Sequence, residues 1–136
     1  MLDALSELEA VVVRLCTLRM NPKQRTLLKA HAEATRNAAV DSDRLAYEAA
    51  NERFHDALYQ HCGNEVVVEH VHQLRLRLAA FRRKVRDQPG RLKSAAAEHD
   101  EVVAGILAND PERAARQCVN TSSPRAGRLL RCCWSR

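Results

Sequence analysis

The chain has 136 residues, of which 46% are apolar and 29% are charged, and its formal net charge is +5. This length suits one domain with a single core, and the 4 glycines and 4 prolines suit a helical chain better than a disordered chain or a turn-rich β sandwich. Arginines in segment 122–136 supply +4 of the net charge, so the charge is weak evidence that the rest of the chain binds nucleic acid.

Capping residues and helix breakers divide the chain into helices. Asn21 followed by Pro22 predicts a helix start, Asp43 offers a second N-cap, Gly63 predicts a stop, and Asp110 before a proline predicts a last start. Short connections between amphipathic helices favour an all-α antiparallel bundle. We predict six main helices at about 2–19, 22–40, 43–61, 65–87, 91–108 and 111–121.

The predicted helix 65–87 carries one apolar stripe, which predicts that this helix packs centrally. Its stripe consists of Val67, Val71, Leu74, Leu78, Phe81 and Val85. Cations flank the stripe, with Arg75, Arg82 and Arg86 on one side and His70, Arg77 and Lys84 on the other. One interpretation is that their alkyl stems cover the core while their charges stay in water. The alternative is that Arg77 or Arg82 contacts a bound carboxylate.

Three polar residues lie at or near apolar helix faces. Asn51 and His55 are one turn apart at the edge of the apolar face of helix 43–61, and His99 falls in the middle of the stripe of helix 91–108. A buried imidazole needs a partner for both ring nitrogens. His99 is therefore either a core histidine that bonds a backbone carbonyl or a water, or it meets His55 at a metal ion or an anionic ligand.

Recognised catalytic and membrane signals are missing from the sequence. There is no glycine-rich phosphate loop, no Cys-x-x-Cys pair and no known nucleophile or zinc-protease motif. No apolar run approaches the roughly 20 residues that span a bilayer. The five cysteines follow neither a zinc spacing nor a disulfide framework, which favours reduced thiols in the cytoplasm.

Two motifs, in this order and spacing, suggest a known family. The first is Phe54-His55-x-x-Leu58 with a Gly-Asn pair after it, and the second is Glu98-His99 with Ile106 seven residues later and an Asp-Pro further on. Residues 2–121 together resemble the FCD domain, the effector-binding half of FadR-type regulators in the GntR family. The resemblance implies an all-α bundle of six to seven antiparallel helices around a central cavity for a ligand or metal. It also implies that the protein is not an enzyme.

In many FCD domains a divalent metal, often zinc or nickel, is bound by an Asp or Asn and three histidines, and small organic acids bind on or near it. The resemblance places these ligands at Asn51, His55 and His99. Thr121 stands at the position of the third histidine and is a poor replacement for it. Cys118 lies one turn earlier and is an alternative ligand, although a buried thiol is the simpler interpretation.

We therefore expect domain 1–121 to sense a small-molecule effector and to form a homodimer, with an atypical basic tail at 122–136. The winged helix-turn-helix domain that binds operator DNA in the family has no room in this chain, so we expect DNA binding through a domain outside it. Two alternatives stay open. The first is a small metal-dependent enzyme that uses Asn51, His55 and His99, and the second is a helical nucleic-acid-binding module that uses the arginine tail.

Overall fold

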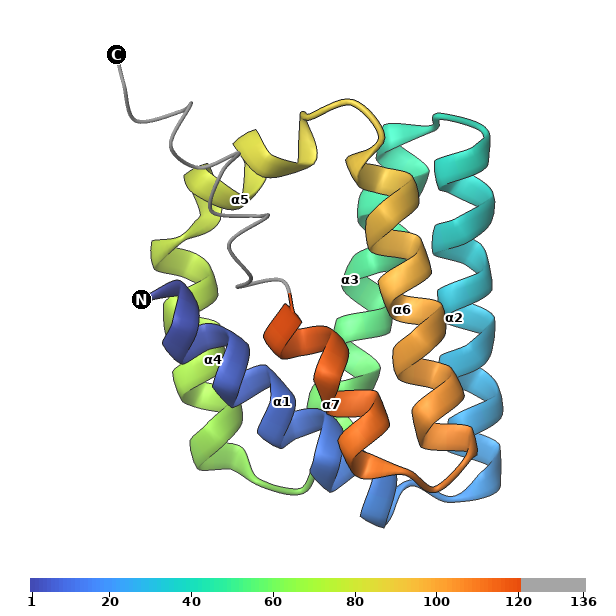
Figure 1. The fold of residues 1–136 in the computed structure, drawn as a ribbon, viewed down its shortest axis with the longest axis vertical. Helices are drawn as coiled ribbons and strands as arrows, with labels where there is room; N and C mark the ends of the chain where they lie inside the picture. The colour runs from blue at the N-terminus through green and yellow to red at the C-terminus, as the bar shows by residue number, and fades with distance from the viewer. Residues whose placement is uncertain (121–136) are drawn as a thin grey trace.

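The structure is a computed structural model that describes residues 1–120, and this part of the chain is helical without strands (Figure 1). Seven helices follow one another: α1 (Leu2–Arg19), α2 (Pro22–Val40), α3 (Arg44–His61), α4 (Glu65–Arg77), α5 (Ala79–Arg86), α6 (Arg91–Leu107) and α7 (Pro111–Asn120). The predicted all-α class is confirmed. The predicted tail 122–136 and Thr121 lie outside the described residues.

The predicted helix starts are confirmed by cap hydrogen bonds. Asn21 and Gln24 form a reciprocal capping box at α2, with bonds of 2.9 and 3.0 Å. The side chain of Asp43 accepts a 3.0 Å hydrogen bond from the backbone N–H three residues later at the start of α3. Gly63 adopts a φ of 70° after α3, and Asn64 then caps α4. These local signals fix where most helices begin and end.

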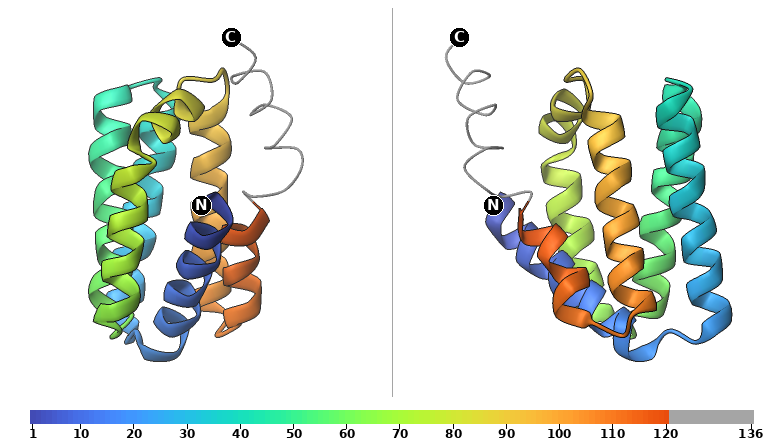
Figure 2. Two further views of the ribbon diagram at one scale, coloured as in Figure 1. Left: turned by 90° about the vertical axis from the view of Figure 1, so that its left-hand side faces the viewer. Right: turned by 45° about the vertical axis from the view of Figure 1, so that its right-hand side comes forward.

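Helices α1 and α2 each pack against more than one other helix (Figures 1 and 2). Helix α2 packs against α3 and α6, while α1 packs mainly against α7 and also contacts α4. Helix α4 lies on the opposite side of the molecule from α2, and α5 runs across one end from α4 toward α6. None of the seven described helices combines the length and apolarity that crossing a bilayer requires.

The main core lies between α1, α2, α3 and α6. Its largest members include Phe54, Leu28, Ile106 and Val12, each at most 1% exposed. A smaller cluster surrounds Tyr47 near the other end of α3 and includes alanines from α2 and α6. The predicted apolar faces of helices 43–61 and 91–108 therefore point into the core, apart from partly exposed residues at their ends.

The prediction of one continuous, central helix at 65–87 was wrong. The helix breaks at Leu78, whose φ and ψ are −95° and 5°, and α5 then takes a new direction. Only Val71 of the apolar stripe is buried, and the other stripe residues are half-buried. Helix α4 is thus a peripheral element.

Ion pairs with α3 hold the end of α5, and no glycine or proline marks the break before it. Arg86 at the end of α5 donates a 2.8 Å hydrogen bond to Glu48 of α3. Next to it, Asp87 pairs with Arg44, also of α3, at 2.5 Å. These contacts hold α5 across the end of the bundle.

Candidate functional site

One face of α3 carries three polar side chains at intervals of one turn, namely Asn51, His55 and Tyr59. They follow from the helical repeat, since residues four apart lie on the same side of a helix. Asn51 is 9% exposed, whereas His55 and Tyr59 are half-buried. This face turns toward the interior because the adjacent Phe54 and Leu58 are core residues.

His99 reaches the same place from α6. It is 8% exposed, and its ring stacks on Phe54 with 4.2 Å between ring centres and 23° between ring planes. The ring centres of His55 and His99 are 5.3 Å apart, and the two planes are nearly perpendicular at 83°. The structure therefore brings both predicted histidines together, with Asn51 one turn from His55. We call Asn51, His55 and His99 the polar cluster.

The side chains of the polar cluster have unused hydrogen-bonding groups. Nδ1 of His99 is buried and bonds no atom of the described residues. Within residues 1–120, the Asn51 amide and the His55 ring also make no hydrogen bond to protein. Leaving a buried polar group without a partner costs about 1–3 kcal/mol, so native proteins rarely do so unless water or a ligand supplies one. The polar cluster has the chemistry of a binding site.

Both histidines are neutral at physiological pH. Burial lowers the pKa of His99 to about 4, and the charges of Arg91 and Arg75 act in the same direction. Burial also lowers the pKa of His55 well below 6.5, with further contributions from Arg75 and His99. A neutral imidazole has one N–H donor and one nitrogen acceptor, so each ring can donate one hydrogen bond to a ligand.

Three arginines face the interior from α4 and α5. Arg75 contacts Glu9 of α1 at 2.7 Å, and Arg82 lies 3.9 Å from the same Oε1 atom. Arg86 pairs with Glu48 at 2.8 Å. We call Arg75, Arg82 and Arg86 the inner arginines. These three cations outnumber the two carboxylates paired with them, and their charges lower the pKa of His55.

The two predicted carboxylate ligands lie in different environments. Arg82 is one of the inner arginines, with a side chain 22% exposed. Arg77, by contrast, is exposed at the end of α4. Its role in ligand binding stays a prediction, and its placement gives that prediction no support.

Sequence reasoning missed Arg75 and Tyr59 as candidate site residues. Arg75 is seven residues before Arg82 on the same flank of the apolar stripe, and Tyr59 follows His55 by one turn. These spacings are the sequence signals that could have identified Arg75 and Tyr59. They do not show which flank of the apolar stripe faces inward, because that depends on how α4 packs against α1.

Comparison with protein families matches residues 1–121 to the FCD domain. The chain belongs to the FCD domain family. FCD domains are the C-terminal effector-binding domains of GntR-type transcriptional regulators, so the polar cluster lies in a regulatory ligand-binding domain. Neither a curated protein nor a solved structure matches this chain.

A divalent metal of the kind found in many FCD domains fits the described residues poorly. About 5 Å between ring centres would suit two imidazoles on one zinc ion, so the spacing of His55 and His99 does not decide the question. However, residues 1–120 contain no group of three His, Cys, Asp or Glu side chains placed to hold a metal. Burial raises the pKa of Cys118 to about 12, so it is a protonated thiol when no metal is bound.

Electrostatics also disfavour a cation in this FCD domain. The polar cluster contains no carboxylate, and the inner arginines near it outnumber the carboxylates of Glu9 and Glu48 that pair with them. The amide oxygen of Asn51 is a neutral donor that cannot offset the charge of a divalent ion. An anion, in contrast, would gain from the same charges.

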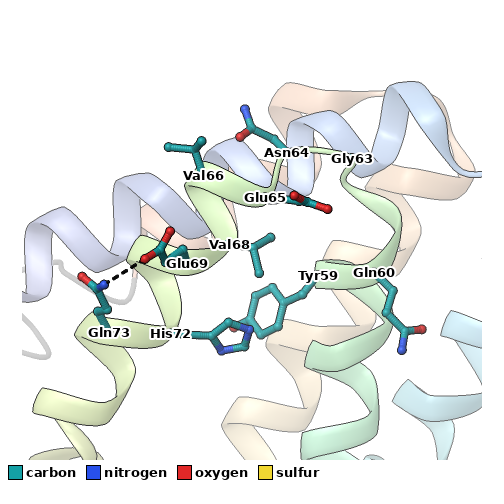
Figure 3. A pocket seen from close by; sticks show the side chains of 10 residues that line it. All are labelled: Tyr59, Gln60, Gly63, Asn64, Glu65, Val66, Val68, Glu69, His72 and Gln73. Atoms are coloured by element: carbon teal, nitrogen blue, oxygen red, sulfur yellow. Dashed lines mark hydrogen bonds between the residues drawn. The ribbon is translucent and has the colours of Figure 1, made fainter.

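A surface groove lies at the α3–α4 connection of this FCD domain, outside the polar cluster (Figure 3). Tyr59 and His72 meet across it with 4.9 Å between ring centres. Its other lining residues are Gln60, Gly63, Asn64, Glu65, Val66, Val68, Glu69 and Gln73. Among the described residues, two carboxylates and no arginine line this groove, so its charge does not suit an organic acid.

Proposed function

We propose that this FCD domain binds a small organic acid at the polar cluster and thereby regulates transcription. The buried Nδ1 of His99, which has no partner within residues 1–120, carries this proposal, because a bound ligand beside Asn51 and His55 would satisfy it. The positive charge of the inner arginines favours an anion over a cation or a neutral molecule.

The proposed contacts follow from the donors available in the site. Neutral His55 and His99 donate one N–H each, and the amide of Asn51 supplies two further donors and one acceptor. Arg82 offers a planar pair of donors that matches a carboxylate better than an ammonium group does. Two to three charge-assisted or neutral hydrogen bonds of this kind are enough to orient a small acid.

Regulation would occur through differential binding and involves no bond making or breaking. The ligand contacts α3, α6 and the α4–α5 unit together, so it stabilises the arrangement in which these helices approach one another. We further propose that the protein belongs to the FadR subfamily, that it forms a homodimer and that a DNA-binding domain outside this chain reads the change. These three points rest on the family.

Binding of small carboxylates tests the proposal. We expect at least one of acetate, succinate and citrate to raise the melting temperature of the purified protein in a concentration-dependent way. Asn51→Leu keeps the branched shape of the side chain while replacing the amide with methyl groups. It should weaken binding of the active acid by about tenfold or more, since one lost hydrogen bond to a charged group is worth roughly 1.5–3 kcal/mol.

Asn37→Leu is the matched control, because Asn37 is exposed on α2 and lies outside the site. It should leave the affinity for the active acid unchanged. Equal affinity of the wild-type protein and the Asn51→Leu and His99→Leu variants would show that the acid binds elsewhere, and would contradict the proposal.

We propose that the acid binds without a resident metal, in keeping with the donor set and the charge. Protein purified without chelator or nickel resin should contain less than about one tenth of a metal ion per chain. The His99→Ala variant is the comparison. A content near one ion per wild-type chain that falls in His99→Ala would overturn the metal-free version and leave acid binding to be explained through the metal.

A further inference from the structure

Two of the inner arginines converge on one carboxylate that belongs to the protein itself. Arg75 is in α4 and Arg82 in α5, on either side of the break at Leu78, yet both approach Oε1 of Glu9 in α1, at 2.7 and 3.9 Å. All three side chains are between 20% and 22% exposed. The site thus holds a carboxylate group between two guanidinium groups in a largely dry environment.

The charges in this group do not balance. Glu9 supplies one negative charge against the two positive charges of Arg75 and Arg82, while Arg86 has its own partner in Glu48. The 3.9 Å separation from Arg82 is too long for a hydrogen bond. Burial lowers the pKa of Arg82 most, and the positive charge of Arg75 lowers it further. Arg82 is therefore a buried cation whose charge Glu9 only partly compensates.

Tyr59 connects this charged group to the polar cluster. The guanidinium carbon of Arg75 lies 5.9 Å from the centre of the Tyr59 ring, and the Tyr59 ring stacks near His55 at 6.1 Å. The Tyr59 hydroxyl is buried close to the Arg75 guanidinium, which can only donate, and it finds no acceptor within residues 1–120. A donor without a partner therefore lies between the arginines and the histidines.

We infer that Arg75, Arg82 and Tyr59 form an anion subsite in which Glu9 acts as a built-in competitor that an incoming carboxylate displaces. The inference rests on the proposed function, because it names a second contact region for the same ligand. When no ligand is present, the carboxylate of Glu9 pairs with the arginines. The apparent affinity of the subsite for an incoming carboxylate falls as the fraction of molecules with Glu9 in the subsite rises. Displacement also breaks the ion pair between α1 and the α4–α5 unit, so ligand binding changes how α1 is held.

Glu9→Gln tests the inference, with Glu7→Gln as its control. Both changes remove one negative charge from α1, but Glu7 is exposed, and no ion pair joins it to the described residues. The probe is propionate, which has the same carboxylate and chain length as the Glu9 side chain. It is titrated by calorimetry and by thermal unfolding in a buffer without other carboxylates, sulfate or phosphate.

We expect Glu9→Gln to bind propionate at least about fivefold more tightly than the wild-type protein, and Glu7→Gln to bind it as the wild-type protein does. Without propionate, Glu9→Gln should melt below Glu7→Gln, because Arg75 and Arg82 lose their counterion. Propionate should close that gap. A structural ion pair without a ligand subsite would give the lower melting temperature but no rescue by propionate.

The outcomes separate this inference from the proposed function. If a carboxylate binds in an Asn51-dependent way but Glu9→Gln does not tighten binding, the competitor role of Glu9 is overturned and the proposed function stands. If Glu9→Gln tightens propionate binding while Asn51→Leu has no effect, the subsite is supported and the polar cluster is not the ligand site. If neither the wild-type protein nor Glu9→Gln binds any carboxylate tested, the anion subsite and the proposed function are both overturned.

Discussion

The imidazole of His99 lies on the face of the Phe54 ring, with 4.2 Å between the ring centres and 23° between the planes. Phe54 comes from α3 and is 1% exposed, so it forms a rigid wall for the histidine of α6. The contact leaves the edge of the imidazole, where both nitrogens lie, as the part that can bond a ligand. It also removes the ring from water, which disfavours protonation of His99 in the folded state.

His99 should make the protein less stable in mild acid. Its pKa is about 4 in the folded state and about 6.5 in the unfolded chain, so the unfolded state binds more protons between these values. The free energy of unfolding should therefore be unaffected by His99 above pH 6.5 and should fall by about 3 kcal/mol as the pH decreases to 4. Urea unfolding across this range, in a buffer with chelator, measures the effect.

His99→Leu provides the comparison for the acid effect. This variant cannot take up the proton, so its unfolding free energy should change less between pH 6.5 and 4 than that of the wild-type protein. Carboxylates and His55 titrate in both proteins, and taking the difference between the two curves removes most of their contribution. Parallel curves would contradict the assignment of the acid effect to His99.

Phe54→Ala should remove both core packing and the wall behind His99. Truncation of a buried phenylalanine costs about 3–5 kcal/mol, and we expect a loss of that size in urea unfolding at pH 7. Leu45→Ala is the control on the same helix, because Leu45 is 84% exposed and surface changes usually stay within about 0.5 kcal/mol. Similar losses in the two variants would argue against the packing around Phe54.

Arg25 joins the ends of three helices through its guanidinium group. It donates hydrogen bonds to the carbonyls of Thr17, Met20 and Ile106, at 2.7, 3.0 and 2.5 Å. These carbonyls lie at the C-terminal ends of α1 and α6, where a cation is favoured by the helix dipole. Arg25→Met should lower the free energy of unfolding by at least about 2 kcal/mol, because the carbonyls lose a charged donor.

Arg36→Met is the control for Arg25, since Arg36 also lies on α2 but makes a surface pair with Asp100 at 2.9 Å. Surface pairs of this kind contribute about 0–1 kcal/mol. In chemical denaturation, the free energy of unfolding of Arg25→Met should therefore be well below that of Arg36→Met. The reverse order would show that the three carbonyl contacts do not stabilise the fold.

Gly105 permits the close approach of α6 and α7. A Cβ atom at this position would lie 2.5 Å from the backbone nitrogen of Ala114, which is far inside contact distance. Gly105→Ala should therefore destabilise the protein by about 1–3 kcal/mol or more, despite the better helix propensity of alanine. Gly90→Ala has open space around it but a φ of 75°, and it should cost roughly 1–2 kcal/mol from backbone strain alone. Thermal unfolding compares the two, and an unchanged melting temperature for Gly105→Ala would rule out the tight crossing.

Local chemistry in the sequence determined most helix boundaries. The cap at Asn21, the cap at Asp43 and the stop at Gly63 depend on hydrogen bonds and dihedral angles within a few residues, and the structure confirms all three. The break at Leu78 was not predictable in the same way. Helix α5 forms ion pairs with α1 and α3, which are distant in the sequence, and no glycine or proline marks the break.

For the candidate site, the sequence by itself determined that Asn51 and His55 share a helix face and that His99 interrupts an apolar stripe, because both follow from the helical repeat. Only the tertiary structure decided that the two histidine rings lie 5.3 Å apart. It also decided that Arg82 faces inward while Arg77 is exposed. The physical reason is that a helical repeat fixes directions around one axis, whereas the packing of α3, α4, α5 and α6 fixes which of those directions meet.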